Sequence, residues 1–550
     1  MTEPKIATMR AASARKSPRD LDALIIGAGF SGLYQLICLR DRLGLDVQIL
    51  EAAEGVGGTW YWNRYPGARC DSESHSYCYT FSDELVQDWD WSERYPGQPE
   101  IMRYLNHVAD RFDLKKDIQF GTRVTRAHFD EGTKRWVITT DGGDRWTAKF
   151  LIAAIGCLST TTMPKIPGLE TFAGRSVHTG QWPHEGVDFA DKRVGLIGTG
   201  STGIQATPVI AETARHLSVF QRTANYSVPA RNAALTPEFR AWVKANFADI
   251  RRTMHGNTNG HPFTIAERRV FDVSAEQRQA LYEAAWEKGG LQFRATFHDL
   301  LLSKEANDTA AAFLRDKIRS IVKNPATAEL LADIDHPYAA KRPPIDTNYF
   351  ETFNRENVTL VDVRRMPIEA ITATGVRTAT ADYALDILVF ATGFDAMTGP
   401  LLGIDVRGRG GIEIAKAWDA GPRTYLGLQI AGFPNLFTVT GPGSPSVLSN
   451  MPVAIEQHVE WITECIAHMR GAGHATIEPT HDAADTWVGE VNAAANATLL
   501  PQAHHSWYLG ANVPGKPRVF MPYAGGMARY RAICADVAAR GYDGFTFGAD

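Results

Sequence analysis

The sequence has few cysteines, no long apolar run and no concentrated positive charge. Its 550 residues include six cysteines, and no two of them form the Cys-x-x-Cys pair that a flavin disulfide reductase needs. No apolar stretch approaches the roughly 18 residues that span a bilayer, and no secretion signal is present. The formal net charge of −5 argues against a nucleic-acid partner. We therefore expect a cytoplasmic protein with no membrane and no nucleic acid among its partners.

The sequence also lacks metal-binding motifs and any strong compositional bias. The histidines show no metal-ligand spacing such as His-Glu-x-x-His, so we predict no metal site. The chain is 44% hydrophobic and 22% charged, which is typical of globular proteins, and its length favours two or more domains. Residues 1–20 carry five basic side chains against two acidic ones, and we expect a disordered extension there. A transit peptide is the alternative.

A glycine-rich turn near the start separates a short apolar run from a helical stretch. The run 23–26 predicts a buried strand, a helical pattern extends to about residue 43, and a second apolar run occupies 47–50. The turn follows the pattern Gly-x-Gly-x-x-Gly and contains Gly27, Gly29, Ser31 and Gly32. This order predicts a complete β–α–β unit of the dinucleotide-binding type.

The same order of elements recurs in the middle of the chain. A strand predicted at 194–197 leads into a second glycine turn, a helix to about 215 and another strand at 217–220. The turn contains Gly198, Gly200, Ser201, Thr202 and Gly203. One such turn is a weak signal, since an ordinary glycine-rich loop can match it. Two in the same strand–turn–helix–strand context predict two dinucleotide sites.

Each unit ends at an apolar closing strand, at 150–156 in the first and 387–393 in the second. Between 225 and 335 a helical insert interrupts the second unit, where Ser274 and Gln277 form a capping-box pattern. We therefore predict an α/β fold with two dinucleotide-binding (Rossmann-like) domains. The expected bounds are 21–155 with 386–550 for the FAD-binding domain, 156–224 with 336–385 for the NADP-binding domain, and 225–335 for the insert of the NADP-binding domain.

The residue that follows the second strand of each β–α–β unit indicates which dinucleotide binds there. Glu51 and Arg222 occupy the same place, because 51 − 27 and 222 − 198 both equal 24. A carboxylate there accepts hydrogen bonds from a ribose 2′-hydroxyl, whereas a guanidinium suits a 2′-phosphate. We therefore expect FAD on the first unit and NADPH, in preference to NADH, on the second. A solvated surface arginine is the alternative for Arg222.

Two further motifs point to a family. The pattern Phe-x-Gly-x-x-x-His-x-x-x-Trp-Pro comprises Phe172, Gly174, His178 and Trp182, and a second motif runs from Gly-Gly-Thr-Trp at 57–60 through Tyr-Pro-Gly at 65–67 to Asp71. With Ala-Thr-Gly at 391–393, the chain from about 21 to 548 resembles the type I Baeyer–Villiger monooxygenases. The stretches 441–451 and 506–512 are most similar to the phenylacetone and steroid monooxygenase branch.

The resemblance implies an FAD-containing, NADPH-dependent enzyme that converts ketones to esters or lactones through a C4a-peroxyflavin. To attack a carbonyl, the peroxide must stay anionic, so a fixed cation beside it has to lower its pKa and stabilise the oxyanion. The family assigns that role to Arg342 and the orienting carboxylate to Asp71. The residues alone leave two alternatives open: a solvated basic pair at Lys341 and Arg342, and a turn-forming Asp71.

The resemblance also implies the remaining contacts. Lys341 is expected on the NADP 2′-phosphate, and further cofactor contacts are expected at Gly58, Thr59, Trp60, Arg69, Tyr77, Val124, Thr223, Met451 and Trp507. Ser446, Val447 and Leu448 are expected to line an apolar substrate pocket. For His178 we favour a structural hydrogen bond over acid–base catalysis.

Two other functions compete with this interpretation. Flavin N- or S-oxygenases are related enzymes, but they have tyrosine where this sequence has Trp182, which favours ketone oxidation. A non-catalytic nucleotide-binding module is the second alternative, and the intact motif from residue 57 to Asp71 argues against it. We expect a ketone and O₂ as partners, and a monomer or small homo-oligomer.

Overall fold

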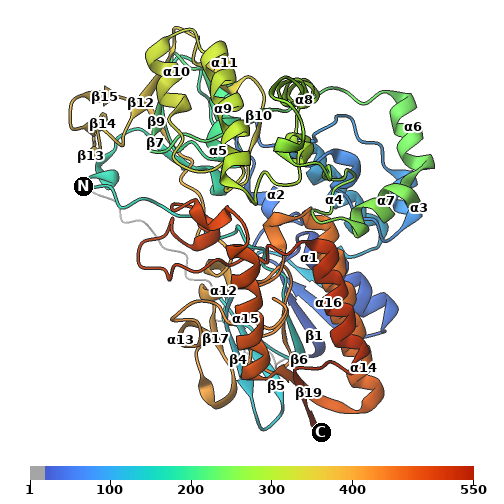
Figure 1. Cartoon of the computed structure of the whole chain (residues 1–550). Coiled ribbons are helices and arrows are strands. Elements are labelled where there is room, and N and C mark those ends of the chain that lie inside the picture. Colours follow the sequence, from blue (N-terminus) through green and yellow to red (C-terminus); the bar gives the residue numbers. More distant parts are fainter. Residues whose placement is uncertain (1–18, 550) are drawn as a thin grey trace, which may run out of the picture.

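The protein consists of two sheet-centred units, which occupy the lower and upper halves of Figure 1. The computed structural model describes residues 19–549. The predicted α/β fold with two Rossmann-like domains is confirmed. Within residues 19–549, no helix combines the length and apolar character needed to cross a membrane.

The first unit is built on an eight-stranded sheet with the order β17-β4-β5-β6-β1-β2-β3, in which β18 also pairs with β6. Parallel pairing of β1 with both β2 and β6 forms the predicted β–α–β core, and β4, β5 and β6 form an antiparallel meander. The strands are β1 (Arg19–Ile26), β2 (Val47–Leu50), β3 (Ile118–Gln119), β4 (Val124–Asp130), β5 (Arg135–Thr140), β6 (Arg145–Ala153), β17 (Asp405–Arg407) and β18 (Leu436–Thr438).

The expected boundary of the N-terminal extension needs correction. Residues 1–18 lie outside the described part of the chain, but Arg19 and Asp20 are the first residues of β1, where they pair with Trp146 and Thr147 of β6. The Thr147 hydroxyl also donates to the Asp20 carboxylate at 2.6 Å. The strand therefore begins at Arg19, four residues before the apolar run 23–26 that predicted it, and the last two residues of the expected extension belong to the sheet.

Helices from both ends of the chain cover the first sheet. Helix α1 (Phe30–Leu36) continues as a π-helix over Ile37–Arg42, which fills the predicted helical stretch. The long helix α14 (Met451–Ala472) lies beside α1 and is buried over most of its length up to Thr463, and Gln35 bonds to that threonine at 3.2 Å. The other elements of this half are α2 (Thr59–Trp62), α3 (Asp83–Asp88), α4 (Gln98–Arg111), α12 (Gly399–Leu402), α13 (Ile414–Ala417), α15 (His481–Asn496), α16 (Met527–Ala539), β19 (His474–Pro479) and β20 (Phe545–Ala549).

The second unit is a five-stranded, all-parallel sheet with the order β12-β9-β8-β16-β7. Its strands are β7 (Arg175–His178), β8 (Arg193–Ile197), β9 (His216–Gln221), β12 (Val358–Asp362) and β16 (Ile387–Phe390), with α5 (Ser201–Thr213) and α11 (Tyr349–Thr352) as its helices. The domain bound expected at 385/386 is therefore wrong, because β16 lies between β7 and β8. The chain leaves this sheet only after Phe390.

The insert predicted between 225 and 335 is helical, and its first three helices lie to the right of the second sheet in Figure 1. Its helices are α6 (Pro237–Ala245), α7 (Phe247–Gly256), α8 (Ala275–Lys288), α9 (Lys304–Ile321) and α10 (Pro325–Ala332). The predicted capping box is present, since the Ser274 hydroxyl accepts from the Gln277 amide at 3.3 Å. Short strands complete the unit: β10 (Val228–Pro229), β11 (Ile345–Asp346), β13 (Ile368–Thr372), β14 (Gly375–Thr378) and β15 (Asp382–Ala384).

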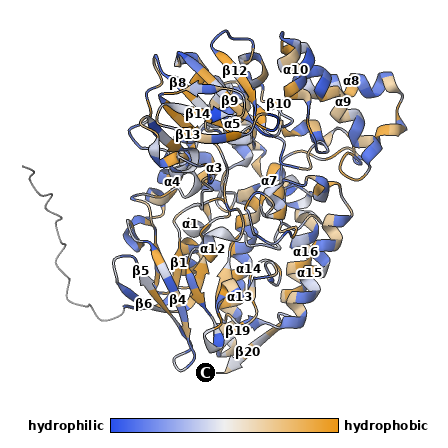
Figure 2. Ribbon diagram, turned by 90° about the vertical axis from the view of Figure 1, so that its left-hand side faces the viewer, coloured by the Kyte–Doolittle hydropathy of each residue, from blue (hydrophilic) through white to orange (hydrophobic). Residues whose placement is uncertain are grey.

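Apolar residues concentrate in the interiors of the two units (Figure 2). The central strands β8 and β16 are almost entirely buried, and so is β1 from Ala23 to Ile26, as expected for parallel strands covered on both faces. Separate hydrophobic clusters form around the two sheets, and Tyr65 and Val447 from the first half belong to the cluster of the second. The two units therefore pack against each other through buried side chains.

Candidate active site

The two glycine turns have the same steric requirements. Gly27 and Gly198 both have positive φ, +102° and +116°, and a Cβ on either would collide with the carbonyl oxygen of the closing strand, Ala154 or Ala391. A Cβ on Gly200 would meet no atom within 4 Å among the described residues. The second turn thus combines tight packing beneath Gly198 with open space at Gly200, which suits the approach of a pyrophosphate to helix N-terminal amides, whereas the matching Gly29 of the first turn contacts Gly58.

The Gly-Gly-Thr-Trp loop lies directly on the first glycine turn. Gly58 has φ +53°, and a Cβ there would come within 2.9 Å of the Gly29 Cα atom. The loop leads into α2, where the Trp60 indole donates to the Tyr77 hydroxyl at 3.1 Å. The structure thus brings the predicted residues Gly58, Thr59, Trp60 and Tyr77 close to the first turn. The residue types in this cradle fit a dinucleotide.

The strand-end residues differ in environment. Glu51 is buried, and its carboxylate accepts from the backbone amides of Ala28 at 2.6 Å and Ala53 at 2.7 Å, so it also holds the glycine turn. Burial raises the pKa of Glu51 despite these bonds.

Arg222, at the matching place in the second unit, is exposed. Burial lowers the pKa of Lys341, the Asp335 carboxylate raises it and the positive charge of Arg222 lowers it, so Lys341 and Arg222 are near enough to act on each other. Such a pair fits a phosphate dianion.

Arg342 is held by the carboxylate of Asp71 in a two-point ion pair. Its Nε atom donates to Oδ2 at 2.6 Å, one terminal nitrogen donates to Oδ1 at 2.7 Å, and the other donates to the Val447 carbonyl at 2.7 Å. The side chains are 23% and 20% exposed. Burial alone would lower the pKa of Arg342, but the Asp71 carboxylate raises it. In turn, the guanidinium lowers the pKa of Asp71 against the effect of burial. The alternatives, a solvated basic pair and a turn-forming Asp71, are therefore wrong for these two side chains.

A cavity of about 550 Å³ opens beside this ion pair. Arg342 lines it together with the predicted substrate residues Val447 and Leu448, and sequence reasoning missed His261, Arg294 and Tyr508, which line it as well. Burial, followed by the charge of Arg342, lowers the pKa of His261 to about 3, so this imidazole is neutral near pH 7.

Some predicted residues lie elsewhere. Ser446 is buried and contacts the Met397 thioether at 3.8 Å instead of lining the cavity. Tyr508, not the adjacent Trp507, enters the cavity wall. Arg69 donates to the Glu93 carboxylate and to the Tyr95 carbonyl, and it forms no ion pair with Asp71 among residues 19–549. The remaining predicted contacts are Val124, buried in β4, Met451, at the start of α14, and Thr223, whose carbonyl accepts from Thr199 at 2.7 Å.

The motif that contains His178 ties the interdomain segment to the second sheet. The His178 ring accepts from the Gly180 amide at 3.0 Å, its other nitrogen lies 3.3 Å from the Thr392 hydroxyl, and burial lowers its pKa. Trp182 is buried near Phe189. A Cβ on Gly174 would collide with the Asp386 carbonyl, and Phe172 packs against the hydrophobic cluster around the second sheet. The expected structural hydrogen bond of His178 is present.

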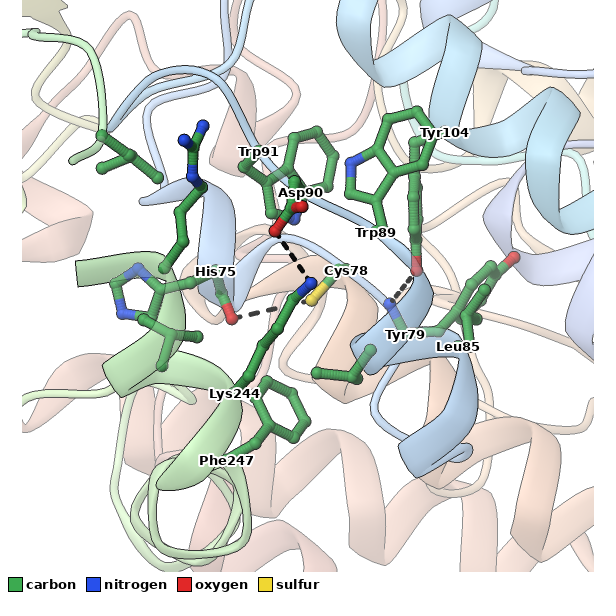
Figure 3. Close-up of a pocket in the computed structure, with 14 residues that line it drawn as sticks. His75, Cys78, Tyr79, Leu85, Trp89, Asp90, Trp91, Tyr104, Lys244 and Phe247 are labelled. Atoms are coloured by element: carbon green, nitrogen blue, oxygen red, sulfur yellow. Dashed lines mark hydrogen bonds and ion pairs between the residues drawn. The ribbon is translucent and has the colours of Figure 1, made fainter. Parts of the chain in front are cut away.

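A second cavity, of about 440 Å³, lies where the segment around α3 meets α6 and α7 (Figure 3). Its wall is mostly apolar and includes the aromatic residues Trp89, Trp91 and Tyr104, and it also contains the Lys244–Asp90 ion pair at 2.8 Å. None of the predicted site residues lines this cavity. We therefore place the candidate site at the Arg342 cavity.

Fold and site together define a class: a two-dinucleotide oxidoreductase with a fixed cation at the cavity between its units. The family model described as "Flavin-binding monooxygenase-like" matches residues 22–234 of this chain. A Baeyer-Villiger monooxygenase from Pseudooceanicola batsensis is 45% identical over 95% of both chains, and an acetone monooxygenase (methyl acetate-forming) from Gordonia is 43% identical over 96% of this chain and 99% of its own. An oxidized steroid monooxygenase bound to NADP superposes with a TM-score of 0.92 at 52% identity, covering 96% of this chain and all of that one. The chain belongs to the Baeyer–Villiger monooxygenase family.

Proposed function

We propose that this enzyme, an FAD-containing and NADPH-dependent monooxygenase, uses Arg342 and Asp71 to convert ketones to esters or lactones. The overall reaction consumes ketone, O₂, NADPH and a proton, and yields ester or lactone, NADP⁺ and water. The observation that carries the proposal is the guanidinium of Arg342, held by two hydrogen bonds to Asp71 at the wall of a cavity.

The two glycine turns support one cofactor each. We assign FAD to the first turn, with Glu51 toward its ribose and the loop at Gly58 against its pyrophosphate. We assign NADPH to the second, with Arg222 and Lys341 toward the 2′-phosphate. FAD, when bound, supplies the hydride acceptance and oxygen activation that no protein side chain provides. The domains follow: 19–155 with 391–549 for FAD, and 156–390 for NADPH, the latter including the helical insert.

The chain's own residues then orient the substrate and control charge. The Arg342 guanidinium keeps its proton, because Asp71 raises its pKa and arginine does not deprotonate in proteins. It can therefore stabilise a negatively charged oxygen without protonating it. Asp71 and the Val447 carbonyl fix the direction of the guanidinium, and Val447 and Leu448 give the ketone an apolar wall. A guanidinium in a fixed orientation beside an apolar wall suits nucleophilic attack on a carbonyl carbon.

Replacing the cation tests this assignment. Arg342→Ala should abolish ester formation from a ketone panel while NADPH oxidation continues, measured by product mass and by absorbance of NADPH. The control Arg252→Gln removes a guanidinium that is 75% exposed on α7 and should change neither rate. If the Arg342→Ala protein, loaded with FAD, still makes ester at the parent rate, the role of Arg342 is refuted. If the parent oxidises amines or sulfides but no ketone, the N- or S-oxygenase alternative holds.

The cellular setting is a further part of the proposal. All six cysteines are free and buried, which supports a reducing compartment, and we propose the cytoplasm. We propose a monomer or small homo-oligomer, which light scattering of the purified holoenzyme tests directly.

A further inference from the structure

The cavity contains a second arginine that the proposed reaction does not use. Arg294 belongs to the short 3₁₀ segment Leu291–Thr296 of the insert, which begins after the two positive-φ glycines Gly289 and Gly290. Its side chain lines the same cavity as Arg342, Val447 and Tyr508. Arg294 therefore faces the space where the substrate has to lie, but it comes from a different element.

The charges around this cavity do not balance. Its lining contains two arginines and no carboxylate, and both oxygens of the nearby Asp71 are already bound to Arg342. Across residues 19–549, Arg294 forms no ion pair within 4.0 Å and no side-chain hydrogen bond. A desolvated cation without a partner is costly, and native proteins pair such groups.

Among residues 19–549, the two other titratable groups that line the cavity do not supply the missing negative charge. His261 is neutral near pH 7, because burial and Arg342 lower its pKa to about 3. Tyr508 is neutral as well, since burial raises the pKa of its hydroxyl to about 12. Burial lowers the pKa of Arg294, and the positive charge of Arg342 lowers it further. The site thus favours an added anion over any rearrangement of the groups already present.

We infer that Arg294 binds an anionic group on the substrate, so that the preferred ketones carry a carboxylate. This inference rests on the proposed function, since it assumes that the ketone carbonyl lies toward Arg342. A guanidinium offers a planar fork that matches a carboxylate in two-point contact. The two cations that line the cavity would thus have separate roles, with Arg342 at the reacting carbonyl and Arg294 at the carboxylate of a keto acid.

Matched pairs of substrates isolate this charge. We would measure kcat/KM for straight-chain methyl-ketone acids of increasing length and for their methyl esters, which share the carbon skeleton without the charge. In the parent enzyme the acid should be preferred over its ester at the best chain length. In Arg294→Gln that acid-to-ester ratio should fall roughly tenfold or more, the range expected for a lost charge-assisted hydrogen bond. Arg294→Lys should restore part of the ratio, and the surface control Arg252→Gln should keep it.

A binding measurement separates this inference from the reaction. Calorimetric titration of the FAD-loaded enzyme with the keto acid, in the absence of NADPH, reports affinity without turnover. The parent and Arg294→Lys should bind the acid more tightly than Arg294→Gln, and raising the salt concentration should reduce that difference.

The outcomes are distinguishable. An acid-to-ester ratio and an acid affinity that are equal in the parent and Arg294→Gln would overturn the role of Arg294. A parent enzyme that binds the acid through Arg294 but oxidises neither acid nor ester would instead overturn the proposed function. FAD absorbance of each variant shows that the comparison is made on folded holoenzyme.

Discussion

Replacing Asp71 by asparagine should uncouple NADPH consumption from ketone oxidation. The substitution keeps the shape of the side chain but removes the charge that orients Arg342. Removing one partner of a buried ion pair costs about 3–5 kcal/mol. Because the two side chains are 23% and 20% exposed, we take the low end, about 3 kcal/mol. If this whole free energy were lost from the stabilisation that the correctly oriented guanidinium gives to the transition state, the rate of ester formation would fall roughly a hundredfold.

The retained amide oxygen can still accept one hydrogen bond, so we expect a loss of roughly tenfold to a hundredfold in ester formed per second. NADPH oxidation should continue, since Arg222 and the second glycine turn are untouched, and the unused reducing equivalents should be released as hydrogen peroxide. The assay records ester, NADPH and peroxide in one reaction. Asp249→Asn, which removes a carboxylate 68% exposed in a surface pair, is the matched control and should keep the parent coupling.

A coupling ratio that stays within twofold of the parent in FAD-loaded Asp71→Asn would refute the reasoning. It would mean that the Val447 carbonyl and the cavity shape suffice to orient Arg342. Loss of NADPH oxidation and ester formation in equal proportion would also contradict it, because that result indicates a general defect in cofactor binding.

Three further predictions follow from local geometry. Arg222→Ala should reduce the preference for NADPH over NADH by roughly tenfold, seen as a change in the ratio of kcat/KM values, because a charge-assisted phosphate contact is lost. Gly198→Ala should weaken NADPH binding, measured by KM, because φ is +116° and the added Cβ would strike the Ala391 carbonyl. Glu456 accepts from Thr80 and burial raises its pKa from 4.5 to about 7, so its contribution to stability is full below about pH 4.5 and is lost as the pH rises through 7. Glu456→Gln, which resembles the protonated form, should flatten the dependence of unfolding free energy on pH between 5 and 8.

Much of the fold was predictable because its signals are local. The two strand–turn–helix–strand units, the Ser274 capping box and the helical insert each depend on residues close together in sequence. Glu51 and Arg222 were predictable for the same reason, since their place is fixed by the length of a β–α–β unit. The strand at 387–390 was predicted as well, but its sheet was assigned wrongly in the domain bounds because a sheet partner is a long-range property.

The cavity was less predictable because its wall is assembled from distant segments. Arg342 and Asp71 are 271 positions apart, and only the family resemblance connected them before the structure did. Arg294 comes from a short 3₁₀ segment and His261 from a loop of the insert, and neither has a periodicity that marks which side chains point inward. Tyr508 and Trp507 are neighbours in one motif, and which of them enters the cavity depends on the turn of a single short 3₁₀ segment.

The lining of the cavity also restricts what proton chemistry is possible there. Its ionisable groups are two arginines, one histidine and one tyrosine. His261 has given up its proton above a pKa of about 3, and Tyr508 keeps its proton up to a pKa of about 12. Arginine does not deprotonate in proteins. Near pH 7 a negatively charged oxygen in this cavity would therefore meet hydrogen-bond donors but no side chain ready to transfer a proton to it. A site that stabilises an oxygen anion without neutralising it favours nucleophilic attack on a carbonyl over the electrophilic oxidation of an amine or sulfide.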